Sequence, residues 1–149
     1  MLTPEENTGS AGKVAAVSSD SPIAKSRRIL FVDDDPEIVD VAKQILSRAG
    51  FQVLSSQNGK QALAVFDRQP VDLVITDLVM PELDGLELIK ELRRRSPALP
   101  IVAISGDFGG RFLRVAMHLG AQGSLLKPFS REELLQAVRT VLGAGSEPR

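Results

Sequence analysis

The sequence predicts an α/β fold, a five-stranded parallel sheet with helices on both faces. Short runs of apolar, often β-branched residues recur along the chain and are typical of strands buried on both faces. Between them lie segments with apolar residues at helical spacing, bounded by capping residues, glycine or proline. Because the two kinds of segment alternate, each pair of strands is joined by a helical crossover, and the sheet is expected to be parallel.

Five strands are expected, at residues 29–32, 52–55, 72–77, 101–105 and 124–126. The second has the weakest apolar run and is expected at an edge of the sheet. The stretch around the third strand organises the rest of the chain, because its buried run ends on a carboxylate, Asp77. Pro81 then prevents further strand pairing.

Each strand is followed by an expected helix. The first begins at Asp35 as an acidic N-cap before Pro36 and ends at Gly50. Its residues at helical spacing are Ile38, Val41, Ala42, Ile45, Leu46 and Ala49. The second helix starts at Asn58 with Gln61 three residues later, the third spans about 84–95 and the fourth about 111–119. The fifth follows a capping box of Ser130 and Glu133 and is expected to end at Gly143.

Length and composition fit one domain of 149 residues. A net charge of −1 gives no reason to expect nucleic acid or an anionic membrane as a partner. The absence of cysteine excludes disulfides and thiolate metal sites, and no signal peptide or membrane span is evident, so a cytoplasmic protein is expected. Residues 1–26, rich in small and polar residues, are expected to form a flexible tail, 27–143 the folded domain and 144–149 a short C-terminal tail.

Acidic residues follow two of the predicted strands. Asp33 and Asp34 come directly after the first strand, and Asp77 is the last residue of the third. In a flavodoxin-like, doubly wound sheet with strand order 2-1-3-4-5 these strands are neighbours, so the three carboxylates meet at one edge. Like charges in one cleft repel unless a cation joins them, and magnesium prefers such oxygen ligands. Asp35 is assigned to helix capping instead.

Two further strand ends complete the expected pocket. Ser105 supplies a hydroxyl after the fourth strand, and Lys127 supplies a positive charge after the fifth. Taken singly, the serine could be a turn residue and the lysine an ordinary surface charge. Together, acids for a metal and a hydroxyl and an ammonium for an anion describe a site for a phosphoryl group.

Four motifs in this order resemble the receiver domains of bacterial two-component response regulators, and the likeness runs over about residues 28–142. They are Ile29-Leu30-Phe31-Val32-Asp33-Asp34-Asp35-Pro36, Thr76-Asp77-Leu78-Val79-Met80-Pro81-Glu82-Leu83-Asp84-Gly85, Ala103-Ile104-Ser105-Gly106 and Leu126-Lys127-Pro128-Phe129. The resemblance implies that Asp77 accepts a phosphoryl group from a phosphohistidine on a histidine kinase or a histidine phosphotransfer protein.

The resemblance also implies the ligands of the site. Asp34, Asp77 and the backbone carbonyl of Val79 would bind Mg²⁺ directly, and Asp33 would act mainly through water. Lys127 would pair with the phosphoryl oxygens, and its peptide bond to Pro128 is expected to be cis. Catalysis would then consist mostly of alignment and charge neutralisation.

Phosphorylation would act by shifting a pre-existing equilibrium between an inactive and an active conformation. Charge-assisted hydrogen bonds from Ser105 and Lys127 to the phosphoryl group contribute about 1.5 to 3 kcal/mol each. Two of them approach the ~5.5 kcal/mol that reverses a 1:99 population ratio. By resemblance, the fourth helix, fifth strand and fifth helix would present the change to a downstream protein.

One position departs from the family pattern. Receiver domains usually carry Tyr or Phe on the fifth strand where this chain has Ser124. Either other groups, such as Phe108 and Phe112, serve the readout or the switch is less tightly coupled. Val79 and Asp107 are expected to flank the phosphoryl group and could tune its lifetime.

Three other functions are alternatives to this switch. A Mg²⁺-dependent phosphohydrolase with an aspartate nucleophile would resemble this sheet, but those enzymes have a second Asp two residues after the nucleophile, where this chain has Val79. A nucleotide-binding module would need a glycine-rich first turn instead of three acids and a proline. A receiver-like scaffold that binds partners without being phosphorylated is the third alternative. The expectation is a stand-alone, chemotaxis-regulator-like signalling switch, not an enzyme, that contacts proteins and not DNA.

Overall fold

The computed structural model describes residues 26–106 and 110–146. It confirms the predicted fold, a single parallel sheet in the order β3-β2-β4-β5-β6, which is 2-1-3-4-5 along the chain. The edge position expected for the second strand is also confirmed. The strands are β2 (Arg28–Val32), β3 (Gln52–Ser56), β4 (Leu73–Asp77), β5 (Ile101–Ser105) and β6 (Gly123–Leu126).

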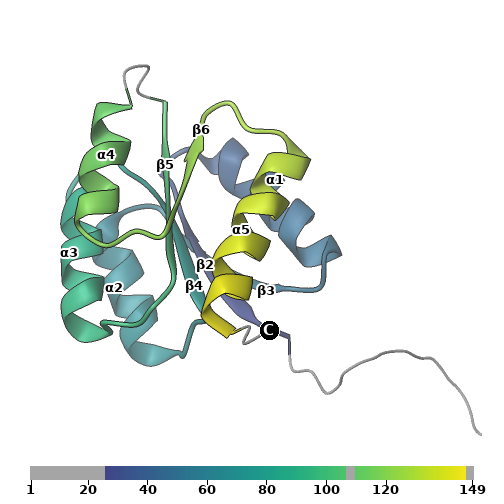
Figure 1. Ribbon diagram of the computed structural model, residues 1–149, viewed down its shortest axis with the longest axis horizontal. Helices are drawn as coiled ribbons and strands as arrows, with labels where there is room; N and C mark the ends of the chain where they lie inside the picture. Colours follow the sequence, from purple (N-terminus) through teal and green to yellow (C-terminus); the bar gives the residue numbers. More distant parts are fainter. Residues whose placement is uncertain (1–25, 107–109, 147–149) are drawn as a thin grey trace, which may run out of the picture.

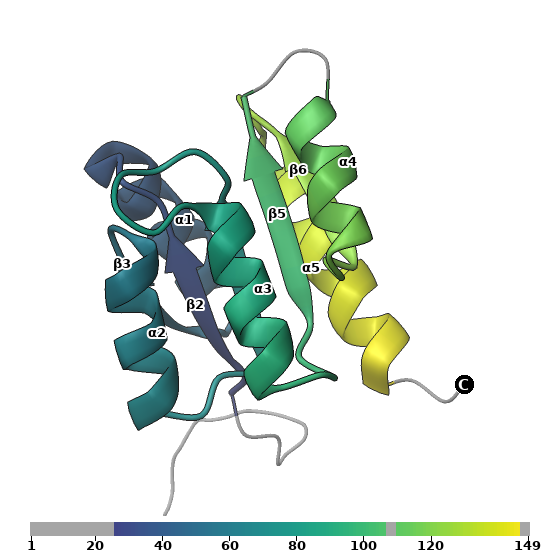
Figure 2. The same ribbon diagram turned by 90° about the vertical axis from the view of Figure 1, so that its left-hand side faces the viewer.

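Helices cover both faces of the sheet (Figures 1 and 2). They are α1 (Pro36–Arg48), α2 (Gly59–Arg68), α3 (Gly85–Arg95), α4 (Arg111–His118) and α5 (Arg131–Ser146). Helices α1 and α5 pack on one face, and α2, α3 and α4 on the other. Among the described residues, none of these helices is long and apolar enough to cross a membrane.

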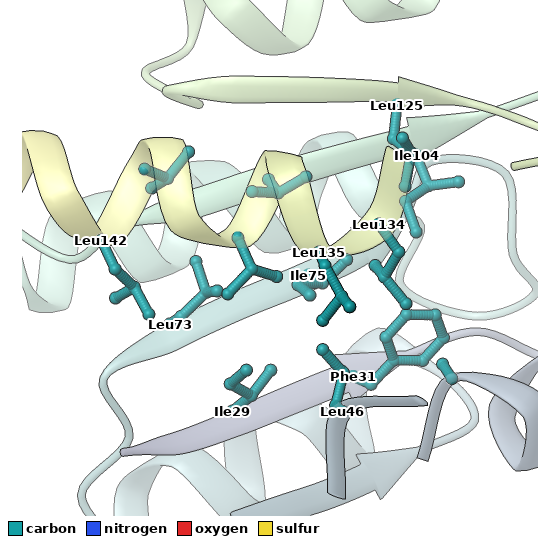
Figure 3. Packing of buried hydrophobic residues seen from close by; sticks show 14 of the residues in the cluster. Ile29, Phe31, Leu46, Leu73, Ile75, Ile104, Leu125, Leu134, Leu135 and Leu142 are labelled. Carbon is teal, nitrogen blue, oxygen red and sulfur yellow. The ribbon is translucent and has the colours of Figure 1, made fainter. Parts of the chain in front are cut away.

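Two hydrophobic clusters hold the layers together, because successive residues of a strand point to opposite faces of the sheet. On β2, Ile29 and Phe31 belong to the cluster beneath α1 and α5, whereas Leu30 and Val32 belong to the cluster beneath the other three helices. Figure 3 shows the first cluster, where Leu134 of α5 lies near Phe31. Apart from Arg28 at the start of β2, the residues of the three central strands are buried, which fixes the register at the site end of the sheet.

Capping interactions start the helices where the sequence predicts. Asp35 Oδ1 accepts a hydrogen bond from the backbone N–H of Glu37 at 2.9 Å. The capping box before α5 is complete, since Ser130 Oγ accepts from Glu133 N at 3.0 Å and Glu133 Oε1 accepts from Ser130 N at 2.8 Å. These bonds satisfy backbone donors that would otherwise lack a partner in the first turn.

Two expectations about helices were wrong. On α1 the buried residues are Val39, Ala42 and Leu46, whereas Val41 is 52% exposed and Ala49 is exposed. The sheet and α5 cover a face of this helix that is rotated from the predicted one, and only Ile38 and Ile45 of its flank pack partly against the core. The last helix continues through Gly143 to Ser146. A glycine costs a helix only about 1 kcal/mol, which burial of neighbouring leucine and valine side chains can offset.

Candidate functional site

The carboxyl ends of β2 and β4 bring the three acidic residues together. Val32 of β2 pairs with Thr76 of β4 in the sheet. The residues that come next on the two strands, Asp33 and Asp77, therefore lie side by side. Asp33 is fully buried and Asp77 is 5% exposed, whereas Asp34 faces solvent. One carboxylate oxygen from each lies within 4.8 Å of the others. The predicted acidic cluster is therefore present, with two members inside the protein and one at the opening.

Lys127 reaches this cluster from the end of β6. Its backbone N–H donates to Ser105 O at 2.9 Å, and its peptide bond to Pro128 is cis, as the resemblance implied. Its Nζ lies 3.0 Å from Asp33 Oδ2 and 3.3 Å from Asp77 Oδ2. The contact with Asp33 is an ion pair to a fully buried carboxylate oxygen.

The oxygens that face the pocket fit a magnesium ion. Asp33 Oδ1 accepts a hydrogen bond from Asp35 N at 2.9 Å, and Asp77 Oδ1 accepts one from Leu78 N at 3.0 Å. The Oδ2 atom of each carboxylate is the one that Lys127 Nζ contacts, so a metal ion would share these oxygens with the lysine or displace it, and Asp34 adds a third carboxylate at the solvent side. Three carboxylates supply hard oxygen donors of the kind that Mg²⁺ prefers. This acidic triad is typical of the receiver Mg²⁺ site.

Burial and mutual charge set the protonation of the site. Burial, and then the negative charge of Asp33, raise the pKa of Asp77 from 3.8 to about 6, although Lys127 and the Leu78 N–H oppose the change. For Lys127, burial alone would lower the pKa, but the ion pairs with both aspartates outweigh it and raise the pKa above 10.5. Lys127 is thus held as a cation between two crowded acids.

The remaining predicted residues lie around the same rim. Ser105 ends β5 and is 1% exposed, next to the strand that carries Asp77. The side chain of Val79 is 61% exposed. Ser124 is exposed on β6, opposite Ala103, and Phe112 is half-buried in the second cluster. The expectations for Asp107 and Phe108 fall outside the described residues.

Sequence reasoning missed the backbone support beneath Asp77. A Cβ at Gly85 would lie 2.1 Å from the carbonyl oxygen of Asp77, so the start of α3 touches the main chain of β4. Thr76 Oγ1 donates to the same carbonyl at 2.8 Å. The loop between them contains Glu82 at φ +64, a strained conformation for a residue with a side chain. The Met-Pro-x-x-Asp-Gly sequence hints at a fixed loop, but the close approach is visible only in the structure.

Gly85→Ala is therefore expected to destabilise the protein by about 2 kcal/mol, because the loop must move away from Asp77. Gly143→Ala is the matched control: it lies on α5 with nothing within 4 Å of the added Cβ, and it should stabilise by about 0.5 to 1 kcal/mol. Urea denaturation followed by circular dichroism measures both. Equal effects of the two substitutions would show that the contact at Gly85 is unimportant.

Comparison with known proteins decides the family. Residues 29–139 match the family model described as "Response regulator receiver domain". The chain belongs to this family. A transcriptional regulatory protein CpxR of Klebsiella pneumoniae is 39% identical over 116 residues, which cover 77% of this chain and 49% of that protein. The receiver thus spans about half the length of the curated relatives it matches.

Solved receiver structures superimpose closely on this chain. A CheY-like receiver domain protein from Methanospirillum hungatei has a TM-score of 0.79 at 26% identity and covers 84% of this chain and 100% of its own. The chemotaxis protein CheY4 of Vibrio cholerae has a TM-score of 0.75 at 31% identity, covering 79% and 100%. The receiver family consists of signalling switches and not of classical enzymes, so this chain is such a switch by family.

Proposed function

We propose that this receiver accepts a phosphoryl group on Asp77, with Mg²⁺ bound, and signals to a protein partner through a change of conformation. The observation that carries the proposal is the buried Asp77 carboxylate beside Asp33, with the Lys127 ammonium in contact with both. In this assignment Asp33, Asp34, Asp77 and the carbonyl of Val79 hold the metal, directly or through water. The metal supplies charge neutralisation for the transferred group.

The proposed transfer uses Asp77 Oδ2 as the nucleophile. This oxygen forms a bond to phosphorus while the bond from phosphorus to the imidazole nitrogen of a phosphohistidine breaks, and the imidazole leaves with the electron pair. Lys127 is close enough to pair with the incoming oxygens, since its Nζ is 3.3 Å from Asp77 Oδ2. Little covalent chemistry is required of the protein, and alignment and charge dominate.

The acyl phosphate would then reorganise its neighbours. Lys127 would exchange its ion pair with Asp77 for one with the phosphoryl oxygens, and the Ser105 hydroxyl at the end of β5 would be drawn toward them. Because these bonds exist only in the phosphorylated protein, they favour whichever conformation makes them best. The expected readout surface is α4, β6 and α5.

The test is incubation with acetyl phosphate and Mg²⁺, followed by intact-mass measurement of the wild type and Asp77→Asn. The expected result is a gain of one phosphoryl group in the wild type that requires Mg²⁺ and is absent in the variant. If the folded wild type gains no phosphoryl group, the result would favour the alternative of a receiver-like scaffold that acts without phosphorylation. Continuous release of phosphate from many esters would indicate a phosphohydrolase instead.

We also propose where the phosphohistidine donor makes contact. Beside the site lies an apolar groove of about 500 Å³ that is lined by Glu37, Ile38 and Val41 of α1 and by Lys127, Pro128 and Phe129. Lys127 belongs to both the groove and the phosphorylation site, so the groove lies next to the point at which a phosphohistidine would meet Asp77. The exposed Val41 would contact an apolar face of that donor.

Val41→Glu is expected to slow phosphoryl transfer from a donor protein by about tenfold while leaving labelling by acetyl phosphate unchanged, because it places a charge in an apolar contact. Val115→Glu, at another exposed valine (42% exposed, against 52% for Val41) on α4, is the matched control. The measurement is transfer of labelled phosphate from a purified phosphohistidine protein that phosphorylates the wild type. Equal transfer to wild type and Val41→Glu would exclude this groove as the contact.

A further inference from the structure

The loop between β4 and α3 is tied to the sheet and to a neighbouring helix by backbone hydrogen bonds. At its base, Leu78 N donates to Ile104 O at 3.0 Å, and Gly85 N donates to Leu78 O at 3.1 Å. Further along the loop, Leu83 O accepts a hydrogen bond of 3.0 Å from Gly59 N at the start of α2. The loop is therefore fixed to β5 at its base and to α2 at Leu83.

Gly59 leaves no room for a side chain at this contact. A Cβ there would lie 2.4 Å from Leu83 O and 2.7 Å from Leu83 Cβ, and the three nearest atoms outside α2 all belong to this leucine. Two carbon atoms that are not bonded to each other do not approach this closely. Gly50 and Gly120 have a left-handed φ, but Gly59 does not. Glycine is therefore needed at position 59 for space and not for its conformation.

Helix α2 is a firm support for the loop. Its N-cap, Asn58, accepts a hydrogen bond from Gln61 N at 2.9 Å, which fixes the first turn. The helix lies beside α3 on the same face of the sheet (Figure 2), and an ion pair between Asp67 and Arg95 joins the two helices. A side chain added at Gly59 would therefore displace the loop and not the helix.

The backbone of the loop is held by its buried residues and contains a strained turn. Leu78 and Met80 are buried in the second cluster, whereas the side chain of Val79 between them is 61% exposed. The backbone at Val79 is thus held by its neighbours and not by its own side chain. Glu82 has a φ of +64, a conformation that persists only where the surroundings fix it. The next residue, Leu83, is the one bound to α2.

We propose that Gly59 is a positioning residue of the phosphorylation site, because through Leu83 it sets the loop that carries the Val79 carbonyl. The inference rests on the proposed function, which assigns this carbonyl to Mg²⁺. Asp33 and Asp77 are positioned separately by the sheet, since β2 and β4 pair directly. A displacement of the loop would therefore move the Val79 carbonyl and leave these two carboxylates in place.

A misplaced ligand weakens magnesium binding more than calcium binding. Mg²⁺ requires near-octahedral geometry at short oxygen distances, whereas Ca²⁺ accepts flexible arrangements with more ligands. Residues that orient a metal ligand without touching the metal typically change affinity by about 10- to 100-fold. Gly59→Ala is therefore expected to lower Mg²⁺ affinity by about tenfold and Ca²⁺ affinity by much less.

Calorimetric titration with each metal measures the two affinities, and urea denaturation followed by circular dichroism shows whether each variant folds. Gly123→Ala is the matched control, because a Cβ at this position, at the amino end of β6, would lie 2.8 Å from Val141 Cγ2. It should lower the urea midpoint without changing either affinity. If Gly59→Ala does not fold, Leu83→Ala replaces it. Loss of this partly buried side chain loosens the same part of the loop and should lower the ratio of Mg²⁺ to Ca²⁺ affinity.

Two results would overturn the inference while the proposed function stands. One is a folded Gly59→Ala, or a folded Leu83→Ala in its place, that binds Mg²⁺ as tightly as the wild type. The other is an equal loss of Mg²⁺ affinity in Gly59→Ala and Gly123→Ala, which would make the effect one of general destabilisation. A wild type that binds no Mg²⁺ identifies failure of the proposed function itself, because the acidic cluster then holds no metal. The inference then falls with it.

Discussion

Asp77→Asn is expected to raise the free energy of unfolding of the metal-free protein at pH 7 by about 2 to 3 kcal/mol. The cause is the unfavourable ionisation of Asp77 in the folded protein, where burial and the charge of Asp33 raise its pKa from 3.8 to about 6. One pKa unit corresponds to about 1.36 kcal/mol, so a shift of about two units sets the upper bound. Asparagine keeps the shape and removes the charge.

The pH dependence has a definite sign. Between pH 3.8 and about 6 the folded protein holds a proton on Asp77 that the unfolded chain has released. Stability from this group is therefore greatest below about pH 4 and falls as the pH rises through 6. The advantage of Asp77→Asn should be full at pH 7 and should vanish near pH 4. Saturating Mg²⁺ should shrink it at pH 7, because a bound cation stabilises only the wild type strongly.

Urea denaturation at several pH values, with and without EDTA or Mg²⁺, measures these differences. Circular dichroism is the signal, since the chain has no Trp or Tyr. Asp40→Asn, at an exposed position on α1, is the matched control and should change stability by less than about 0.5 kcal/mol. If Asp77→Asn is still more stable than the wild type at pH 4, or is not more stable at pH 7, the unfavourable ionisation of Asp77 is not the cause.

The assembly of the site could be predicted because it follows from topology. Polar residues that end neighbouring parallel strands must meet at one edge, and the strand order places Asp33 beside Asp77. Ser105 and Lys127 are added by the same rule. The sequence could not predict the distances between the Lys127 ammonium and the carboxylates of Asp33 and Asp77. That Lys127 lies between two carboxylates, and so competes with a cation for them, depends on a few ångströms of loop geometry.

The errors on the helices also have physical causes. The first helix carries two overlapping apolar faces, one containing Val41 and one containing Val39, and only packing against α5 and the sheet selects the second. A glycine predicts a helix end only when the backbone adopts a left-handed φ. Gly50 does so after α1, but Gly143 does not. The strained φ of Glu82 has no sequence signal, because glutamate does not favour that conformation.

Lys127→Met is expected to have opposite effects on stability and on metal affinity. In the metal-free protein it removes the counter-ion of Asp33 and Asp77, both buried, and should lower the free energy of unfolding at pH 7 by about 3 kcal/mol. Mg²⁺ affinity should rise by about tenfold or more, because the ammonium no longer occupies the space between the two carboxylates. A merely structural lysine would affect stability alone.

Titration with Mg²⁺ by calorimetry, and the dependence of stability on Mg²⁺ concentration, measure the affinity in two independent ways. Lys43→Met, at an exposed position on α1, is the matched control and should alter neither quantity. A fall in Mg²⁺ affinity on Lys127→Met would mean that the lysine supports the metal instead of competing with it. If affinity rises, Lys127 serves as an internal counter-ion that holds the two acids together until metal binding and phosphoryl transfer give it a new partner.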